Sequence, residues 1–507
     1  MNPSGKLTTR LHPEDNVVVA GVDISEGTTI PEENIVCRNP IRFGHKIATQ
    51  SIDADAPIRK YGQIIGFAHR TIEPGEHVHE HNMGMKEFDR EYAVGADLKP
   101  ESVSSGEQAT FDGIVRADGR VATRNYIGVL SPVNCSATVA HRIAERFKGD
   151  ALAGYPNIDG VVPASYDWGC GFEVGGEGYN RIIDTFAGYL RHSNFAGILL
   201  VGLGCEDCSW EAIVERSGLQ KGPFLQAITI QDSGGTPKTI QRGAALVREM
   251  LPEANRIERR PVSAGRLIVG LECGGSDGYS GITANPALGA ASDRVVRSGG
   301  TVVLAETPEI YGAEHLLIRR AVNRKVADKL IERINWWKDY ALRNKGELNN
   351  NPTLGNKAGG ITTILEKSLG AAAKGGTTRL MEVYRYAEPI DTKGFVFMDT
   401  PGYDPPSITG MVAGGANLIC FTTGRGSAFG FKPVPSIKLA SNSALYRRME
   451  DDMDVNAGRV LEGEDIKTVA AEFVELALAV TSGQPSKSEA LGIGEEEFCP
   501  WPLGGML

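Results

Sequence analysis

The sequence lacks the features that would direct it to a membrane, to secretion or to nucleic acid. No run of about 18 apolar residues is present, and residues 1–23 contain no cationic segment followed by an apolar run. The net charge of -10 is spread along the chain without a block of Lys or Arg, which argues against nucleic acid as a partner. We therefore expect a cytoplasmic protein with no membrane partner.

Cysteine is scarce as well, with 8 residues in a chain of 507. This number is too small for a disulfide scaffold, and in a reducing compartment most of these thiols stay free. The chain is also too long for a single hydrophobic core, so we expect roughly two to four domains. Apolar residues make up 41% of the chain, which allows each domain to build its own core.

Residues 1–92 differ in pattern from the rest of the chain. Short alternating apolar runs are separated by turn residues such as Gly62 and the Pro74-Gly75 pair. The clearest runs are 16–20, 45–48 and 63–68. Many short strands joined by turns at this spacing predict a small all-β domain. The polar stretch 93–110 that follows has the composition of a linker.

From residue 111 onward, apolar runs alternate with stretches of helical periodicity. The apolar runs, most of which end beside glycine, cysteine or an acid, are 126–130, 160–162, 197–203, 267–271, 301–305, 394–398 and 418–421. Helical periodicity is clearest in 179–190, 314–342 and 466–480. This alternation predicts parallel sheets covered by helices. We expect two such α/β domains, residues 111–260 and 261–507, divided near the charged, proline-containing stretch 252–264.

Four cysteines share one local setting, directly after a predicted strand: Cys135, Cys170, Cys205 and Cys273. Ligands bind at the carboxyl ends of parallel strands. If these ends converge, three or four thiolates could ligate iron, as a single ion or as a cluster. The alternative is that the thiols only pack, since free cysteine is among the most buried residue types. Cys37, Cys420 and Cys499 lack this setting and are expected to pack, while Cys208 stays open.

Glu306 and Glu309 lie three residues apart where a predicted strand turns into a helix. Two carboxylates in this position suit a cation or a catalytic base. The alternative is a capping pair that faces solvent.

Histidines are concentrated in two short segments of the small domain: His45, followed by Lys46, and then His77, His79 and His81. Alternate positions on a strand point to one face, which suits metal binding or proton transfer. A solvated, histidine-rich edge is the alternative.

Three glycine-rich loops carry hydroxyl, amide or cationic side chains: 274–278, 355–360 and 422–427. Exposed backbone N–H groups beside Lys357 and Arg425 would bind a carboxylate or phosphate. None of the loops matches a Walker A sequence or a dinucleotide fingerprint. Simple turn formation is the alternative, but three such loops favour an anionic ligand.

Several long sequence blocks resemble the altronate/galactarate dehydratase family, in order along nearly the whole chain. The small domain is similar to that family's β-clip (SAF-type) domain. The blocks are GHKIA at 44–48, HVHEHN at 77–82, GLGCE at 202–206, LECGGSDGYSGITANP at 271–286, ETPEIYGAE at 306–314, NPTLGNKAGGITTILEKSLG at 351–370 and FTTGRGSAFG at 421–430. The family often has a histidine shortly before Gly169-Cys170, where this chain has Tyr166-Asp167-Trp168.

The resemblance implies dehydration of a hexonate, altronate first, or a hexarate to a 2-keto-3-deoxy acid with iron(II), with Mn²⁺ or Mg²⁺ as substitutes. On this hypothesis the metal ligands are Cys135, Cys170, Cys205 and Cys273. Glu306 or Glu309 completes the ligand shell or acts as base, and His45 with Lys46 delivers protons from the small domain. The substrate carboxylate and hydroxyls would be held by Ser276, Asp277, Asn285, Lys357 and Arg425.

Other functions remain open at this point. Galactarate or another aldarate or aldonate is an alternative substrate. A sulfolactate sulfo-lyase uses a related module and body, normally on two separate chains, and the fused architecture here argues against it. A non-catalytic carbohydrate-binding protein is the alternative from another class, and the acid- and thiol-bearing strand ends argue against that. We also expect a homo-oligomer, most simply a dimer.

Overall fold

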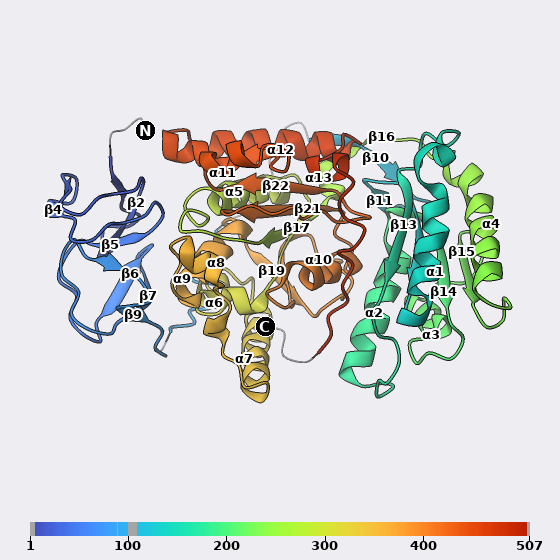
Figure 1. Ribbon diagram of the computed structural model, residues 1–507, viewed down its shortest axis with the longest axis horizontal. Coiled ribbons are helices and arrows are strands. Elements are labelled where there is room, and N and C mark those ends of the chain that lie inside the picture. Colours follow the sequence, from blue (N-terminus) through green and yellow to red (C-terminus); the bar gives the residue numbers. More distant parts are fainter. Residues whose placement is uncertain (1–5, 89, 100–108, 504–507) are drawn as a thin grey trace.

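The chain folds into three domains, which we call first, second and third in chain order. The computed structural model describes residues 6–88, 90–99 and 109–503. The first and second domains lie at opposite ends of the molecule, and the third domain, formed by the last part of the chain, lies between them (Figure 1). The predicted fold class, an all-β domain followed by α/β domains with parallel sheets, is confirmed. Part of the predicted linker, residues 100–108, lies outside the described residues.

The first domain consists of short antiparallel strands, as predicted. Its sheets have the orders β1-β2-β5-β8, β6-β7-β9 and β3-β4. The strands are β1 (Thr8–Thr9), β2 (Val17–Ala20), β3 (Thr29–Ile30), β4 (Ile35–Val36), β5 (Lys46–Ala48), β6 (Pro57–Lys60), β7 (Gln63–Ala68), β8 (His77–Val78) and β9 (Met83–Gly84). One of its two apolar clusters includes Ala313, Leu369 and Ala372 of the third domain. The first domain is therefore docked through a shared core.

The second domain is built on a parallel sheet of order β13-β12-β14-β15. Its strands are β12 (Tyr126–Ser131), β13 (Gly160–Ser165), β14 (Phe195–Gly202) and β15 (Leu225–Thr229), and its helices are α1 (Asn134–Ala144), α2 (Glu177–Arg191), α3 (Trp210–Ser217) and α4 (Thr236–Ala254). Every residue of β12 is buried. Ile127 and Val129 belong to one apolar cluster and Leu130 to another, because alternate residues face the helices on opposite sides of the sheet.

The third domain contains a seven-stranded parallel sheet of order β19-β20-β18-β17-β21-β22-β23. Its strands are β17 (Ile268–Cys273), β18 (Thr301–Leu304), β19 (Leu380–Tyr384), β20 (Gly394–Met398), β21 (Leu418–Thr423), β22 (Ser436–Ala440) and β23 (Val455–Asn456). Its helices are α5 (Ala284–Arg297), α6 (Glu314–Ile318), α7 (Arg324–Arg343), α8 (Leu354–Ala358), α9 (Ile364–Ala372), α10 (Asp404–Ala413), α11 (Ser443–Arg448), α12 (Ile466–Thr481) and α13 (Lys487–Ala490). Helices α5 and α12 pack on each other above the sheet in Figure 1. No described helix combines the length and apolar character needed to cross a membrane.

The predicted apolar runs all form strands, whereas one helix prediction is wrong. The periodic stretches 179–190 and 466–480 form α2 and α12. The stretch 314–342 is not one helix but two, α6 and α7. The chain turns between them because Ala321 forms a β-bridge with Leu380, and the Asn323 side chain caps α7 by accepting a hydrogen bond from the backbone N–H of Val326 at 3.0 Å.

A small antiparallel sheet of order β11-β10-β16 stands at the junction of the second and third domains. Its strands are β10 (Thr110–Val115), β11 (Val121–Ala122) and β16 (Arg260–Ser263). Strand β16 falls within the predicted break 252–264 and pairs with β10 at the start of the second domain. The chain therefore enters and leaves the second domain through neighbouring strands.

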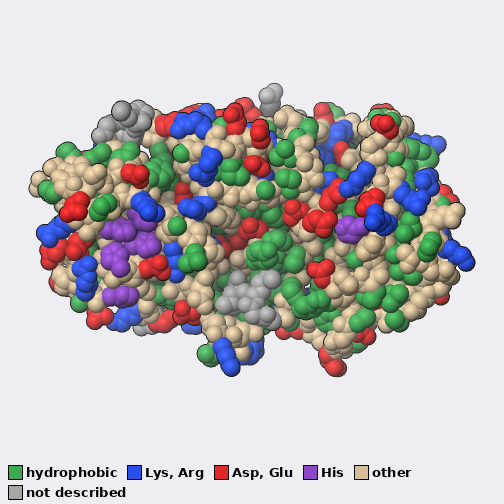
Figure 2. Space-filling view, viewed as in Figure 1, with side chains coloured by type: hydrophobic (Ala, Val, Ile, Leu, Met, Phe, Trp, Pro, Cys, Tyr) green, Lys and Arg blue, Asp and Glu red, His purple; other side chains and the backbone are tan. Residues whose placement is uncertain are grey.

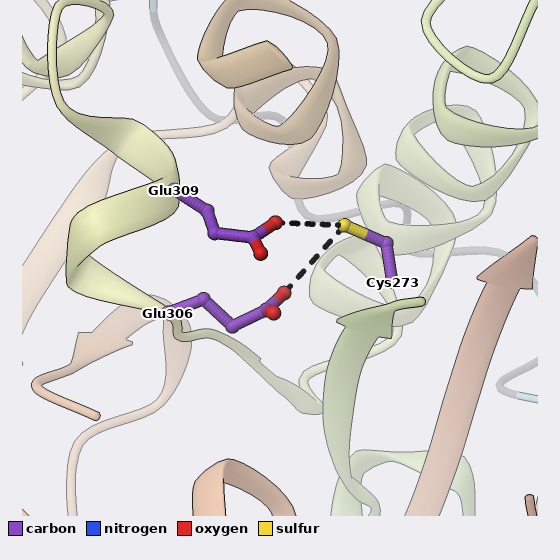
Figure 3. A group of neighbouring side chains, drawn as sticks. All are labelled: Cys273, Glu306 and Glu309. Carbon is purple, nitrogen blue, oxygen red and sulfur yellow. Dashed lines mark hydrogen bonds between the residues drawn. The ribbon is translucent and has the colours of Figure 1, made fainter. Parts of the chain in front are cut away.

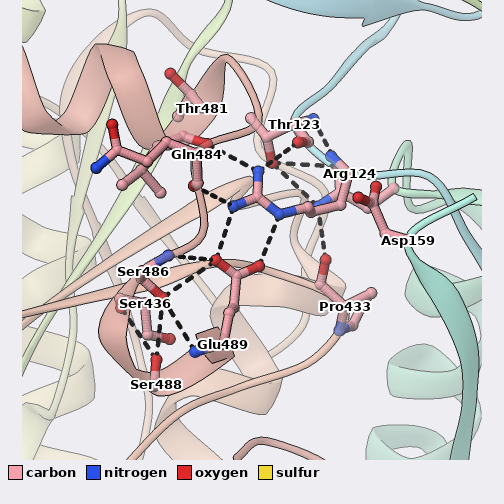
Figure 4. Close-up of polar contacts among 12 residues, drawn as sticks. Thr123, Arg124, Asp159, Pro433, Ser436, Thr481, Gln484, Ser486, Ser488 and Glu489 are labelled. Carbon is pink, nitrogen blue, oxygen red and sulfur yellow. Dashed lines mark hydrogen bonds and ion pairs between the residues drawn. The ribbon is translucent and has the colours of Figure 1, made fainter. Parts of the chain in front are cut away.

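The second and third domains are also joined through Arg124, whose guanidinium is enclosed by groups of the C-terminal segment (Figure 4). It donates two hydrogen bonds to the Glu489 carboxylate, from Nε at 2.7 Å and from Nη2 at 2.7 Å. Further donors reach the carbonyl oxygens of Val480 at 2.8 Å and Gln484 at 3.0 Å. The side chains are only 3% and 12% exposed, so removal of either partner leaves a buried charge uncompensated.

We predict that Arg124→Met lowers the free energy of unfolding by about 3 kcal/mol, because it leaves the buried Glu489 carboxylate without its cationic partner. Chemical denaturation of the full chain measures this change. The matched control is Arg142→Met, which breaks the exposed pair with Glu145 and should cost under about 1 kcal/mol. Equal effects of the two substitutions would contradict the proposed role of Arg124.

The first domain is held to the third by a buried ion triad. Glu366 of α9 accepts a hydrogen bond from Lys46 Nζ at 2.8 Å and another from Lys60 Nζ at 3.0 Å. Lys46 Nζ also donates to the Gly360 carbonyl at 2.6 Å and to Thr362 Oγ1 at 2.9 Å. Burial alone would raise the pKa of Glu366, but the two ammonium groups outweigh burial and lower this pKa from 4.5 to about 2.

The stability that the Glu366 carboxylate gives this interface should be lost at acidic pH. Because the pKa of Glu366 is lower in the folded protein, its contribution is complete above pH 4.5 and is lost as the pH falls from 4.5 to about 2. We predict that the destabilisation caused by Glu366→Gln is constant near neutral pH and shrinks below pH 4.5, as measured by denaturation at several pH values. The surface substitution Glu382→Gln serves as control, and an unchanged difference across this range would refute the prediction.

Candidate active site

Three predicted residues meet at the carboxyl edge of the seven-stranded sheet. Cys273 is the last residue of β17, and Glu306 and Glu309 follow the neighbouring strand β18. The Cys273 thiol lies 3.6 Å from Glu306 Oε2 and 3.5 Å from Glu309 Oε2, and the three side chains point toward one another (Figure 3). Adjacent parallel strands end at the same edge of a sheet, which explains the convergence.

Two lysines from outside the sheet neutralise these glutamates. Lys367 Nζ, on α9, donates to Glu309 Oε1 at 2.6 Å, and Lys374 Nζ donates to Glu306 Oε2 at 3.0 Å. Lys374 is completely buried and Lys367 nearly so. Such burial is tolerated only because each ammonium group has a carboxylate partner.

A second acidic group overlaps the first. Ligand oxygens of Glu272, Glu306 and Asp404 all lie within 4.8 Å of one another, as do the donor atoms of Cys273, Glu306 and Glu309. Glu306 is common to both groups. Glu272 Oε1 and Glu306 Oε1 are buried without a hydrogen-bond partner. Since an unpartnered buried oxygen is costly, this arrangement fits either a shared proton or a bound cation.

The electrostatic environment separates Glu306 from the other acids. Burial and the charge of Glu306 raise the pKa of Glu272 and of Glu309. The same causes, together with Glu309, raise the pKa of Asp404 to about 8. Burial would raise the pKa of Glu306 too, but Lys374 outweighs it, so that this pKa is lowered. The site therefore contains one carboxyl group of lowered pKa, Glu306, next to acids of raised pKa, which is the pairing that acid–base chemistry requires.

Glu306 also has a strained backbone. Its φ of 65° lies in the left-handed region, which costs a glutamate about 1–3 kcal/mol. The conformation is fixed because the N–H of Glu306 donates to Thr400 Oγ1 at 2.8 Å and the N–H of Thr307 donates to the Thr400 carbonyl at 3.0 Å. Strain of this kind is typical of functional positions, and here it turns the Glu306 side chain into the acidic group.

A cavity of about 10 Å³, room for about one water molecule, adjoins Cys273 and reaches the interface with the first domain. It is lined by Lys60, Tyr61, Ser276, Asp277, Asn285, Glu366 and Lys367, among others. Three of the five predicted substrate-binding residues, Ser276, Asp277 and Asn285, are in this wall. Asn285 donates to the Gly370 carbonyl at 2.9 Å and accepts from Thr422 Oγ1 at 2.7 Å, so it shapes the wall rather than presenting a free amide.

Asp277 is similarly occupied within the protein. It accepts hydrogen bonds from Ser280 Oγ at 2.9 Å, Ser441 Oγ at 2.9 Å and Asn442 Nδ2 at 3.1 Å. The carboxylate thus fixes the glycine-rich loop against its neighbours. Its direct contact with a substrate remains a prediction.

The two predicted cations lie nearer the surface. Lys357 Nζ pairs with Glu80 of the first domain at 2.6 Å, and Arg425 is exposed. A Cβ built on Gly355 would lie 3.9 Å from Arg425 Cδ, so the loops that carry Lys357 and Arg425 are adjacent. Binding of an anion by this pair remains a prediction.

The histidines gather on one face of the first domain, beside the third domain (Figure 2). His45 Nδ1 lies 3.0 Å from His77 Nε2, and His45 Nε2 lies 3.2 Å from the carbonyl oxygen of Ala358. Burial and the neighbouring histidines lower the pKa of His77 to about 3. Lys46, by contrast, donates hydrogen bonds within the ion triad with Glu366 and so is not free to donate elsewhere. This position argues against the predicted proton delivery by Lys46.

The four predicted metal-binding cysteines are divided between two domains. Cys273 is buried in the third domain, whereas Cys135, Cys170 and Cys205 are exposed and follow β12, β13 and β14 of the second domain. Their local pattern is the same, but the strands belong to two different sheets. Ligation of one metal by all four thiols remains a prediction. Cys37 and Cys420 are buried, as expected of packing residues.

Sequence reasoning did not select Glu272, Lys367, Lys374 or Asp404. Glu272 was visible beside Cys273, but a strand residue gives no sign of the face it occupies. Lys374 follows the small apolar stretch 369–373, and a lone lysine in such a stretch is a usable signal of a buried charge.

Three family models match the chain in order. They are the altronate/galactarate dehydratase SAF domain over residues 6–86, the D-galactarate dehydratase/altronate hydrolase second domain over 113–255, and the D-galactarate/altronate dehydratase C-terminal domain over 264–505. These ranges coincide closely with the three folded domains.

Full-length relatives agree with the family models. An altronate dehydratase of Bacillus subtilis is 35% identical over 94% of this chain and 96% of its own length. A galactarate dehydratase (L-threo-forming) of Escherichia coli is 35% identical over 94% of this chain and 92% of its own length. The (2R)-sulfolactate sulfo-lyase subunit beta of Chromohalobacter salexigens is 30% identical over 76% of this chain and 95% of its own length. The chain therefore belongs to the altronate/galactarate dehydratase family.

Proposed function

We propose that this chain is a sugar-acid dehydratase that removes water from a hexonate such as altronate and forms a 2-keto-3-deoxy acid. The observation that carries the proposal is the buried group of acids and lysines around Glu306, which adjoins an enclosed cavity in a chain of this family. Buried acids whose pKa values are shifted in opposite directions favour catalysis over carbohydrate binding alone.

Dehydration of a sugar acid makes two chemical demands. A weakly acidic proton must leave C2, beside the carboxylate, and a hydroxide must leave C3. The resulting enol then tautomerises to the 2-keto acid. Fixed positive charge near the substrate carboxylate stabilises the ene-diolate that develops, and Lys367 and Lys374 supply such charge without reorganisation.

Glu309 is our candidate for the base. Its pKa is raised, which makes its ionised form a stronger base than an ordinary glutamate. The 2.6 Å contact with Lys367 Nζ fixes its orientation. Asp404, kept protonated near neutral pH by burial and by Glu306, is our candidate for the acid that donates a proton to the leaving hydroxide.

The residues present fit a cation at Glu306. Cys273 and Glu306 would hold it, with Glu272 close by, and the unpartnered oxygens of both glutamates would gain a partner. A thiolate ligand favours Fe²⁺ over Mg²⁺, because sulfur prefers softer cations. When bound, Fe²⁺ would supply Lewis-acid stabilisation of the charge that develops on the substrate.

A substrate panel tests the function. Anaerobically purified protein is chelated, restored with Fe²⁺, Mn²⁺ or Mg²⁺, and assayed with aldonates, aldarates and sulfolactate. We expect a 2-keto-3-deoxy acid from a hexonate and the largest recovery with Fe²⁺. Sulfite release from sulfolactate would point to the sulfo-lyase instead, although that relative's beta subunit matches only 76% of this chain. Full activity without metal would overturn the metal assignment, and saturable binding without turnover would overturn the enzyme.

Two glutamine substitutions distinguish a base from a ligand. Glu309→Gln should lower kcat by about 100- to 10,000-fold while the iron content stays unchanged, because it removes the base alone. Glu306→Gln should lower both iron content and activity. Metal analysis and steady-state kinetics measure the two effects, with Glu382→Gln as a control that should alter neither. Loss of iron in Glu309→Gln would make Glu309 a ligand.

A further inference from the structure

Three exposed thiols lie at one edge of the four-stranded sheet of the second domain. Cys135, Cys170 and Cys205 occur at equal intervals along the chain, each shortly after one of three strands that are neighbours in the sheet. Strand β12 is central and pairs in parallel with β13 and β14, so the three following loops leave the same edge. The proposed dehydration at Glu306 makes no use of these thiols.

Direct hydrogen bonds tie the three loops together. The N–H of Asn134, beside Cys135, donates to the Trp168 carbonyl at 2.8 Å. The loop after β14 reaches the loop after β13, because the N–H of Cys208 donates to the Gly169 carbonyl at 3.1 Å and the N–H of Gly171 donates to the Asp207 carboxylate at 2.7 Å. The thiols are therefore presented by one connected platform rather than by three independent loops.

Glycine permits this close approach. Gly169, which precedes Cys170, has a φ of +113°, and a Cβ there would lie 2.6 Å from the Pro132 carbonyl oxygen and 2.7 Å from Val133 Cα. Gly204, which precedes Cys205, has a φ of +123°, and a Cβ there would lie 2.6 Å from Gln231 Oε1. Any other residue would separate the loops or strain them.

The three thiols are too far apart to bind one tetrahedral ion. A tetrahedral ion with metal–sulfur bonds of about 2.3 Å requires sulfur atoms about 3.8 Å apart. Among the described residues, the three-membered groups with all donors within 4.8 Å do not include Cys135, Cys170 and Cys205. A cluster holds each thiolate on a different iron and so accepts a wider triangle. The N-terminus of α1, which carries Cys135, adds positive character beside an anionic cluster.

We propose that Cys135, Cys170 and Cys205 bind a 4Fe–4S cluster in the second domain, separate from the cation site at Glu306. Three protein thiolates leave one iron without a cysteine ligand. That iron is open to an exchangeable oxygen ligand, such as a carboxylate or hydroxyl group, at the exposed edge of the sheet.

Anaerobic reconstitution of the full chain with Fe³⁺, sulfide and a thiol that reduces part of the iron to Fe²⁺ tests the proposal. We expect about four sulfides and about five iron atoms bound per chain, one of the irons at the separate Glu306 site, with the visible absorption of a cluster and an electron paramagnetic resonance signal on reduction. Cys135→Ser, Cys170→Ser and Cys205→Ser should each lose most of the bound sulfide and the visible band. Because these side chains are exposed, circular dichroism should show that the variants stay folded.

Two controls keep this result separate from the dehydratase site. Cys273→Ser and Cys37→Ser should retain the sulfide and the visible band, since neither thiol belongs to the platform. Iron lost from the Cys135→Ser, Cys170→Ser and Cys205→Ser variants, with no sulfide bound in the unsubstituted chain, would overturn the cluster in favour of a single ion. An iron content that none of these three substitutions changes, again without sulfide, would overturn the site. Loss of the band in Cys273→Ser would restore a site shared by all four cysteines. None of these readouts depends on the dehydratase activity.

Discussion

The buried negative charge of Glu306 is the constraint around which the third domain is organised. A carboxylate this deep in a protein is stable only with a partner, and Lys374 provides it at 3.0 Å. Burial, together with the charge of Glu306, raises the pKa values of the nearby acids Glu272, Glu309 and Asp404. The strained backbone of Glu306 is kept in place by the next strand end through Thr400. The shifted pKa values and the strained backbone of Glu306 thus both follow from placing its carboxylate in this buried position.

The same rule governs how the domains are joined. Glu366 is buried between two ammonium groups of the first domain, and Arg124 is buried against Glu489 and backbone carbonyls of the C-terminal segment. Such pairs add little net stability compared with apolar contacts, but they penalise any other arrangement strongly. Through Lys60 and Tyr61 the first domain also contributes to the wall of the cavity. Its position is therefore part of the site, which gives a physical reason for carrying the small domain on the same chain.

The two α/β domains present different types of potential ligand at their sheet edges. Carboxylates and lysines collect at the carboxyl edge of the seven-stranded sheet, while exposed thiols collect at the corresponding edge of the four-stranded sheet. Both edges are formed by loops that follow parallel strands, where backbone and side chains of several loops meet. One architectural rule thus accounts for both proposed sites, one suited to a single borderline cation and the other to a thiolate-bound cluster.

The sequence by itself determined the family, the all-β and α/β order of the domains, and nearly every strand that it predicted, because continuous apolar runs and long family blocks are local properties of the chain. It also selected Cys273, Glu306 and Glu309, since a residue just after a buried strand must lie at a sheet edge.

Only the tertiary structure decided which sheet each of these residues borders and which side chains meet there. Cys135 and Cys273 look alike in sequence, yet their strands enter different sheets. From the sequence, Lys46 was expected to deliver protons together with His45. In the structure its ammonium group donates to the carboxylate of Glu366, which is 320 residues away. Lys374 and Asp404 lie in segments distant from Glu306 in the sequence, and long-range packing brings them next to it. No local sequence pattern predicts this contact.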